Sequence, residues 1–335
     1  MKLLSALRVF FAGLAVAIGS GAAQAQPMKL EFLFPTPTQI GHAPYNAAID
    51  QGFFKDEGLE IETKYLSGSG NVFRLLVSGQ GDIAYVANGV VQSGILAGAN
   101  VRAISSVQPI SDHQFIVSAK GSGRIADYAD KKIATLTAGA LTSIEPMALL
   151  KKHGARTDKI EWIMSGAVAA RLQGIAAGTF DAAAVDLFNS LKGVRGGDAK
   201  ILASIPAEFP GFGLGYDVVR ADSLKDPAKR KALKAYVKAL VKGARYVMQN
   251  PKGATAGIMK RLPKLEPDLV EETIVKLNEL KLWPHNGGVE RSVTEFTSRV
   301  HVEYGGTDLY AREVKYEEIV DPSLVDEVIK DLGKI

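Results

Sequence analysis

Apolar and polar positions along the chain alternate between two kinds of segment. Short apolar runs of strand length are followed by longer runs with helical periodicity. The predicted strands cover residues 30–34, 59–66, 82–86, 101–105, 114–118, 132–136, 160–164, 181–185, 201–204 and 216–219. The predicted helices between them begin near Ala43, Gly70, Asn88, Leu141, Ala167 and Leu187. This alternation predicts parallel sheets with helices on both faces.

The pattern changes near Asp226, where strand-like runs give way to helical ones. Helices are predicted over residues 226–250, 251–261, 267–280, 290–303 and 323–332. Pro227, Pro251 and Pro267 fall at first-turn positions, where the missing N–H of proline costs nothing. The last third of the chain is therefore predicted to add helices to an α/β core.

Two segments of the chain carry nearly the same pattern. SGQGDIAYV at residues 78–86 and AGTFDAAAV at 177–185 each follow a helical run, and each has Gly, two residues, Asp and then small apolar residues. The pattern predicts two similar α/β units, one in each of two lobes. The alternative is that such helix–glycine–strand order occurs in any α/β protein.

The similarity extends upstream of both segments. In each copy a helix ends at a glycine, a strand follows, and a Ser-Gly pair precedes the next helix. Gly58 and Gly154 are expected just past their helices in the left-handed conformation. Ser67 and Ser165 are expected to be the N-caps of the helices that follow.

Five loops of small residues are predicted at the edge where the parallel strands end. They cover residues 36–39, 67–70, 87–89, 137–139 and 165–167. Ligands of α/β sheets bind at this edge, and backbone N–H groups at helix starts can hold a carboxylate, sulfonate, nitrate or phosphate. One such loop would be an ordinary turn, but five together favour a binding cleft between the lobes.

The first 25 residues have the order of a secretory signal peptide. Lys2 and Arg8 precede an apolar run over residues 9–18, and Ala23-Gln24-Ala25 forms a cleavage site. The run is shorter than the roughly 20 residues needed to span a bilayer. The alternative is an N-terminal core helix. Cleavage is predicted after Ala25, and a periplasmic location is expected, although secretion to the outside also fits.

Composition narrows the possible chemistry. The chain has no cysteine, which excludes disulfides, thiolate metal sites and a lipid-anchored cysteine. Without the predicted signal peptide, which holds two basic residues and no acid, the net charge falls from +4 to +2. A nearly neutral chain of 310 residues argues against nucleic acid as a partner and allows one large or two medium domains.

Several segments carry a resemblance to a known family. The most specific is AIDQGFFKDEGLEIE at residues 48–62, and His42-Ala43-Pro44, SGQGDIA, AGTFDAA and IADYADKKIA at 125–134 add to it. The sequence resembles the periplasmic substrate-binding proteins of ABC importers of the nitrate, sulfonate, taurine and thiamine-pyrimidine group. The match covers most of the mature chain and is weakest between residues 251 and 306.

The resemblance implies a two-lobed, type II periplasmic-binding-protein fold with two α/β lobes, two crossover strands and extra C-terminal helices. The crossings are expected near residues 115–120 and 214–220, which gives a first lobe of 27–117 plus 219–335 and a second lobe of 118–218. The lobes would close on a ligand by a hinge movement. The implied protein is a monomer without cofactor or bound metal. Its partners would be a small solute and an inner-membrane ABC permease with its cytoplasmic ATPase.

Residues at the predicted ligand edge and in the segments of resemblance are candidates for ligand binding. They are Thr36, Thr38, His42, Ser67, Gly68, Ser69, Asn88, Thr137, Thr142, Ser165, Gly166, Arg171, Asp186, Phe188 and Phe212. His42 could bind an anion or a heterocycle, or only fix its loop. Asp186 could accept a hydrogen bond from an amino group, or cap the next helix. Arg171 could reach the ligand, or form a salt bridge on the helix surface. Phe188 and Phe212 could form apolar walls.

The predicted function is high-affinity extracytoplasmic capture of a small organic anion or zwitterion, such as a sulfonate or a taurine-like compound, for import. One alternative is import of a nitrogen heterocycle resembling the thiamine pyrimidine. Another is a periplasmic sensor that presents its ligand to a membrane receptor. An enzyme is not predicted, because the sequence has no Ser-His-Asp arrangement at known spacing, no H-E-x-x-H motif and no cysteine.

Overall fold

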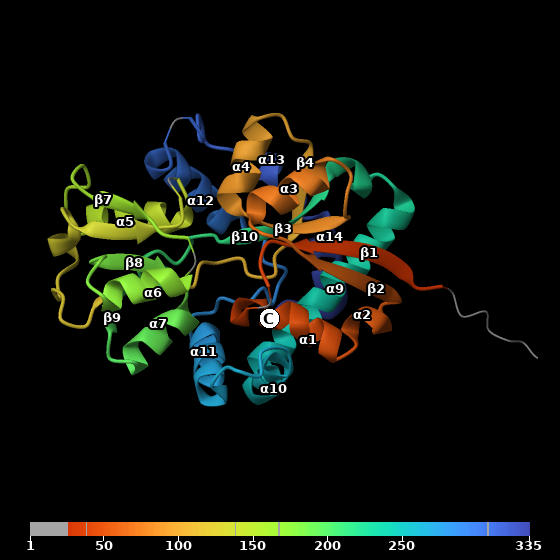
Figure 1. The fold of residues 1–335 in the computed structure, drawn as a ribbon. Helices are drawn as coiled ribbons and strands as arrows, with labels where there is room; N and C mark the ends of the chain where they lie inside the picture. Colours follow the sequence, from red (N-terminus) through yellow and green to blue (C-terminus); the bar gives the residue numbers. More distant parts are fainter. Residues whose placement is uncertain (1–25, 38, 138, 167, 307) are drawn as a thin grey trace, which may run out of the picture.

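The computed structural model describes residues 26–335 except 38, 138, 167 and 307, so the predicted signal peptide lies outside the described residues. Among the described residues the strands form two five-stranded sheets (Figure 1). The first, in the order β2-β1-β3-β10-β4, contains β1 (Met28–Phe34), β2 (Leu59–Tyr65), β3 (Ile83–Ala87), β4 (Val101–Ser105) and β10 (Gly215–Arg220). The second, in the order β7-β6-β8-β5-β9, contains β5 (Gln114–Ser118), β6 (Lys132–Thr135), β7 (Glu161–Met164), β8 (Ala182–Val185) and β9 (Ala199–Ser204). Every predicted strand is confirmed.

The prediction of a two-lobed α/β fold is confirmed, but the sheets are mixed rather than wholly parallel. Strand β10 runs antiparallel to β3 and β4, and β5 runs antiparallel to β8 and β9. Each antiparallel strand is the one that arrives from the other lobe. It enters its sheet at the edge where the parallel strands end, so it must run in the opposite direction.

The pairing also corrects where the chain crosses between the sheets. Residues 114–117, expected in the first lobe, pair with strands of the second sheet. Residues 215–218, expected in the second lobe, pair with strands of the first sheet. The two passages therefore cover residues 106–113 and 205–214, before the predicted crossings. Apolar runs identify strands but carry no information on which sheet each strand joins.

The helices flank both sheets. The first lobe has η1 (Ile40–His42), α1 (Ala43–Asp50), α2 (Phe53–Asp56), α3 (Ser69–Val77) and α4 (Asn88–Leu96). The second has η2 (Ile125–Tyr128), α5 (Leu141–Lys152), α6 (Val168–Ala176) and α7 (Leu187–Arg195), and α8 (Ile205–Glu208) lies in the second passage. The C-terminal part contains η3 (Ala221–Leu224), α9 (Pro227–Gln249), α10 (Pro251–Arg261), α11 (Pro267–Glu279), α12 (Arg291–Tyr304), α13 (Tyr316–Ile319) and α14 (Ser323–Leu332). The predicted helices of this part are confirmed.

The repeated aspartate makes the same contacts in both lobes. The Asp82 backbone N–H donates to the carbonyl of Glu31, and the Asp82 carboxylate accepts from the Glu31 N–H at 3.0 Å. Asp181 makes the same pair of bonds with Lys132, at 2.8 and 2.9 Å. The repeated residue therefore fixes the neighbouring parallel strand, β1 or β6, far from the edge where the strands end.

The repeated glycines are as predicted, whereas the first serine cap is not. Gly58 and Gly154 have φ values of 68° and 72°, the left-handed conformation that ends a helix. The N-cap of α3 is Gly68 at φ 82°, and Ser67 is exposed one position earlier. The residue directly before α6 lies outside the described residues, so the N-cap role predicted for Ser165 stays a prediction.

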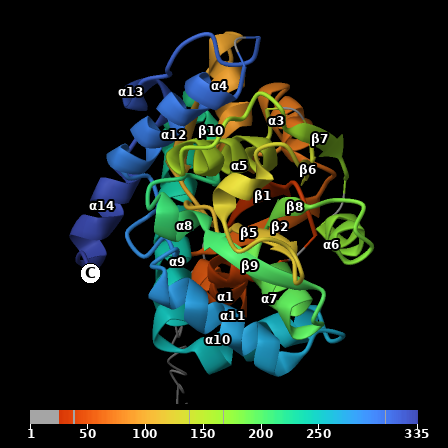
Figure 2. The same cartoon turned by 90° about the vertical axis from the view of Figure 1, so that its left-hand side faces the viewer.

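The C-terminal helices contact both lobes (Figures 1 and 2). Helix α11 packs on α7 of the second lobe, and α12 packs on both α4 and α5. The Arg195 guanidinium at the end of α7 reaches Asp268 and Glu272 of α11, each at 2.7 Å. Opening the lobes requires these contacts to break or to move with one lobe.

None of the helices in the described ranges is both long enough and apolar enough to cross a membrane.

Candidate functional site

The strand ends of the two sheets lie next to each other because the passages are short. Residues 106–113 join the end of β4 to the start of β5, and residues 205–214 join the end of β9 to the start of β10. In each sheet β5 or β10 starts where the parallel strands end. The two passages also pair with each other, Ile110 with Gly213. The residues that follow the parallel strands therefore lie at the sheet edges next to the passages, where the sequence predicts a ligand site.

A buried ion pair lies at this edge of the second lobe. Glu145 of α5 is completely buried, and its Oε2 lies 2.6 Å from Nδ1 of His113, the residue before β5. Burial alone would lower the pKa of His113, but the carboxylates of Glu145 and Asp112 raise it to about 9. His113 is therefore charged near neutral pH. The second oxygen of Glu145, Oε1, is buried and has no hydrogen-bond partner among the described residues.

Two further carboxylates lie beside this pair. The buried Asp112 accepts a hydrogen bond from Gln108 Nε2 at 3.0 Å and another from the Leu187 N–H at 3.2 Å. Burial raises the pKa of Asp112 to about 6, and the charge of Asp186 acts in the same direction. The Asp186 carboxylate accepts a hydrogen bond from the Asn189 N–H at 3.1 Å. Asp186 therefore caps α7, the role given above as the alternative to binding an amino group.

Arg171 points inward. Arg171 is only 5% exposed to solvent. Its Nη1 donates a hydrogen bond to the carbonyl of Ala184, near the end of β8, at 3.0 Å. The surface salt bridge considered as its alternative is therefore wrong. Burial lowers the pKa of Arg171, while the charges of Asp186 and Glu145 oppose this shift. Its Nε is buried and, in the part of the chain that the structure describes, makes no hydrogen bond.

Asn88 is the first-lobe residue with the largest unsatisfied capacity for hydrogen bonds. It begins α4, is fully buried, and neither Nδ2 nor Oδ1 has a partner within the described ranges. Its amide lies against Gly213 of the second passage, where a Cβ would come within 2.1 Å of Nδ2. Buried polar atoms without partners cost about 1–3 kcal/mol each, so such a group calls for a ligand or water.

His42 fixes its own loop. Its Nδ1 accepts from the Gln39 N–H at 3.2 Å, and its ring centroid lies 4.1 Å from that of Phe34. Burial lowers the pKa of His42 to about 3, so the ring is neutral and offers no charge to an anion.

Several predicted hydroxyls serve the loops. Thr142 Oγ1 accepts from the Leu136 N–H and lies 2.9 Å from Thr135 Oγ1, and Ser69 Oγ accepts from the Ala87 N–H at 3.2 Å. Of the remaining small residues, Ser165 is buried, Thr36 is half-buried, and Gly68, Thr137 and Gly166 are exposed. Thr38 lies outside the described residues.

The two predicted aromatic walls lie in apolar clusters. Phe212 is fully buried, and its ring centroid lies 5.9 Å from that of Phe209 and 5.8 Å from that of Phe296. Phe188 is half-buried against the cluster that joins α7 to α10 and α11. Asn88, Arg171 and Asp186 therefore lie at the edge where the parallel strands end, next to the two passages. We call this edge of both sheets the interlobe edge. Glu145 and Asp112, which the sequence had not indicated, lie there too.

Glu145, His113 and Asp112 were missed by the sequence interpretation. Glu145 lies between the buried residues Ile144 and Pro146 of α5. An acidic residue flanked by apolar residues in a helix was the one sign in the sequence that could have pointed to a buried carboxylate. His113 and Asp112 lie in a passage that carries neither helix nor strand periodicity. In the described residues no group of three or more histidines and acids could hold a metal ion.

Comparisons with known proteins agree with this architecture. The model of the NMT1/THI5-like family matches residues 39–254. The periplasmic aliphatic sulphonate binding protein SsuA from Escherichia coli is 14% identical, with a TM-score of 0.71 over 88% of this chain and 93% of that one. The periplasmic nitrate-binding protein NrtA from Synechocystis PCC 6803 is 16% identical, with a TM-score of 0.72 over 92% and 90%.

A third solved structure is the alkanesulfonate-binding protein SsuA from Xanthomonas axonopodis pv. citri bound to MOPS. It is 17% identical, with a TM-score of 0.70 over 89% of this chain and 99% of that one. A sequence search of curated proteins finds no significant match.

Proposed function

Because the chain belongs to the NMT1/THI5-like family, we propose that it is the extracytoplasmic solute-binding component of an ABC importer. It captures a small polar solute between its lobes and delivers it to an inner-membrane permease with a cytoplasmic ATPase. The fold supports this proposal, since the sulphonate- and nitrate-binding proteins named above share it. The predicted signal peptide agrees with a periplasmic location.

The observation that carries the proposal is the set of buried, unpartnered polar atoms at the interlobe edge. Glu145 Oε1 and Asn88 Oδ1 can accept hydrogen bonds, and Asn88 Nδ2 and Arg171 Nε can donate them, and none has a partner in the described chain. A solute that carries both donors and acceptors would satisfy them. Asn88 belongs to the first lobe and Glu145 and Arg171 to the second, and a few polar groups with free hydrogen-bonding capacity are what a small-molecule site requires.

The same atoms favour one ligand class over another. Nitrate and simple alkanesulfonates only accept hydrogen bonds, so they cannot satisfy Glu145 Oε1, which is itself an acceptor. A zwitterion of the taurine type, or an amino-substituted nitrogen heterocycle, presents N–H donors to Glu145 and acceptors to Arg171 and Asn88. We therefore propose an amino-bearing solute, with Glu145 as the residue that recognises the amino group.

Calorimetric titration of the purified protein tests both parts of the proposal. The probes are taurine and an aminopyrimidine, each paired with its analogue that lacks the amino group, ethanesulfonate and a pyrimidine. We expect the amino compounds to bind more tightly, and Glu145→Gln to weaken them roughly 10- to 150-fold, since a hydrogen bond to a charged group is worth about 1.5–3 kcal/mol. The matched control is Glu161→Gln, at an exposed position of β7 in the same lobe.

Two results would count against the amino-bearing class. One is equal affinity for taurine and ethanesulfonate, and the other is binding of taurine or the aminopyrimidine that Glu145→Gln leaves unchanged. The import role is tested separately by uptake of the bound solute in cells with and without the gene. Unchanged uptake would exclude import by this protein.

A further inference from the structure

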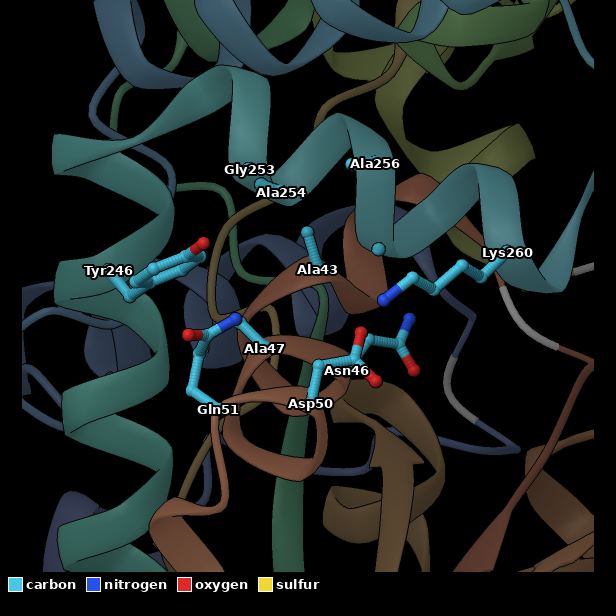
Figure 3. A pocket seen from close by; sticks show the side chains of 11 residues that line it. Ala43, Asn46, Ala47, Asp50, Gln51, Tyr246, Gly253, Ala254, Ala256 and Lys260 are labelled. Atoms are coloured by element: carbon cyan, nitrogen blue, oxygen red, sulfur yellow. The ribbon is translucent and has the colours of Figure 1, made fainter.

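A pocket of about 220 Å³ lies outside the interlobe edge, between α1, the end of α9 and α10 (Figure 3). None of the described residues that the sequence predicted for ligand binding is among those that line it. Small residues line much of it, alanines from α1 and both alanines and glycines from α10. The pocket is chemically asymmetric, with an aromatic end and a polar end.

Asn46 is the polar group that the fold leaves unsatisfied in this pocket. The residue is 3% exposed, it lines the pocket from α1, and its Nδ2 has no hydrogen-bond partner in the described part of the chain. A buried amide donor of this kind costs about 1–3 kcal/mol unless an acceptor reaches it. The pocket is the space from which an acceptor can arrive.

Lys260 gives the same end of the pocket a positive charge. Its side chain extends from α10 toward Asn46 and Asp50, and no carboxylate of the described residues lies within 4.0 Å of its ammonium. Asp50 does not cancel this charge, because the Arg261 guanidinium holds both of its oxygens, at 2.6 and 2.7 Å. Lys260, Arg261 and Asp50 together leave one net positive charge next to the unpaired amide.

The opposite end holds the ring of Tyr246 and the uncharged amide of Gln51. Figure 3 shows the ring of Tyr246 at the far end of the pocket from Lys260, with Ala43 and Ala254 between them. The Tyr246 hydroxyl already accepts a hydrogen bond from Asn250 Nδ2 at 3.0 Å. The hydroxyl is therefore engaged in holding the start of α10, and the ring lines the pocket.

We propose that this pocket is a second binding site, separate from the interlobe site, for a small organic carboxylate. The carboxylate accepts hydrogen bonds from Asn46 Nδ2 and from the Lys260 ammonium, and the apolar body of the ligand lies against Tyr246 and the alanines. Charge-assisted hydrogen bonds of this type are the stronger kind. Because the ligand contacts α1 and α10 together, it fastens a C-terminal helix to the first lobe.

Titration with benzoate, followed by NMR or calorimetry, tests this proposal on the purified protein. Benzamide, which has the same ring without the charge, is the ligand control. We expect benzoate to saturate one site, benzamide to bind more weakly, and Lys260→Ala to weaken benzoate about tenfold, equivalent to about 1.4 kcal/mol. The matched control is Lys252→Ala, an exposed lysine of the same helix that does not line the pocket.

A second variant fills the pocket without touching its polar groups. Ala256 lines the pocket from an exposed position of α10, so Ala256→Leu is expected to fold and to abolish benzoate binding. The proposal is overturned if benzoate shows no saturable binding up to about 10 mM, a concentration that would detect a millimolar site. It is also overturned if both Lys260→Ala and Ala256→Leu bind benzoate as the unchanged protein does.

Discussion

His113 and Glu145 form a pair whose stability must depend on pH. The folded state raises the pKa of His113 from 6.5 to about 9, so the folded protein holds this proton more tightly than the unfolded chain does. The stabilisation is fully present below pH 6.5 and is lost as the pH rises through 9. We expect His113→Gln to lower the free energy of unfolding by about 3 kcal/mol more at about pH 6 than at about pH 10.

Urea unfolding of both proteins at the two pH values measures this difference. His153→Gln is the control, since His153 is exposed and lies 3.4 Å from Glu208 on the outside of the second lobe. Equal destabilisation by His113→Gln at both pH values would contradict the assignment of a charged, buried pair.

Two of the site residues were predictable because they follow a strand. Asn88 and Asp186 come directly after β3 and β8, and the strand pattern alone placed them at the right edge. Glu145 lies one turn inside α5, and only the tertiary packing of that helix shows that its carboxylate is buried. His42 was placed at the right edge, but its bond to the Gln39 N–H could not be foreseen from residue type.

At the scale of the elements, the repeated aspartate is a structural device that both lobes use. Asp82 and Asp181 each bond the N–H of the neighbouring parallel strand, at 3.0 and 2.9 Å. We expect Asp82→Ala and Asp181→Ala each to lower the free energy of unfolding by about 1.5–3 kcal/mol, since a hydrogen bond to a charged group is lost. Ligand affinity should not change, because both residues are remote from the interlobe edge.

Chemical denaturation and calorimetric titration together check this expectation. Asp198→Ala, at an exposed position after α7, is the control for removing a charge from the second lobe. A loss of ligand affinity with unchanged stability in either variant would show that the repeat belongs to the binding site instead.

At the scale of the whole molecule, periodicity predicted the strands and the C-terminal helices because it reports local burial. The two lobes were predicted from the repeated pattern and the family resemblance. The sequence did not predict that β5 and β10 run antiparallel in the opposite sheets, because sheet membership is set by contacts between distant segments. It also did not predict that α11 and α12 would each contact the second lobe. Those contacts arise from apolar faces whose partners are far away in sequence.

The contact between α7 of the second lobe and α11 makes lobe opening depend on the charge of Arg195. Arg195 of α7 lies between Asp268 and Glu272 of α11, each at 2.7 Å, with Glu266 at 3.7 Å. Arg195→Glu would place a fourth carboxylate among these three, so repulsion replaces attraction across the interface. Because exposed ion pairs are individually worth at most about 1 kcal/mol, the variant should remain folded while its lobes separate more often.

Small-angle X-ray scattering of the ligand-free protein is expected to give a larger radius of gyration for Arg195→Glu than for the unchanged chain. Added salt should reduce the difference, since it screens exposed charges. Arg156→Glu is the matched control, because Arg156 pairs with Asp158 within the second lobe at 2.7 Å and spans no interface. If both variants scatter like the unchanged protein, α11 moves with the second lobe or does not restrain it, and the lobes open at another boundary.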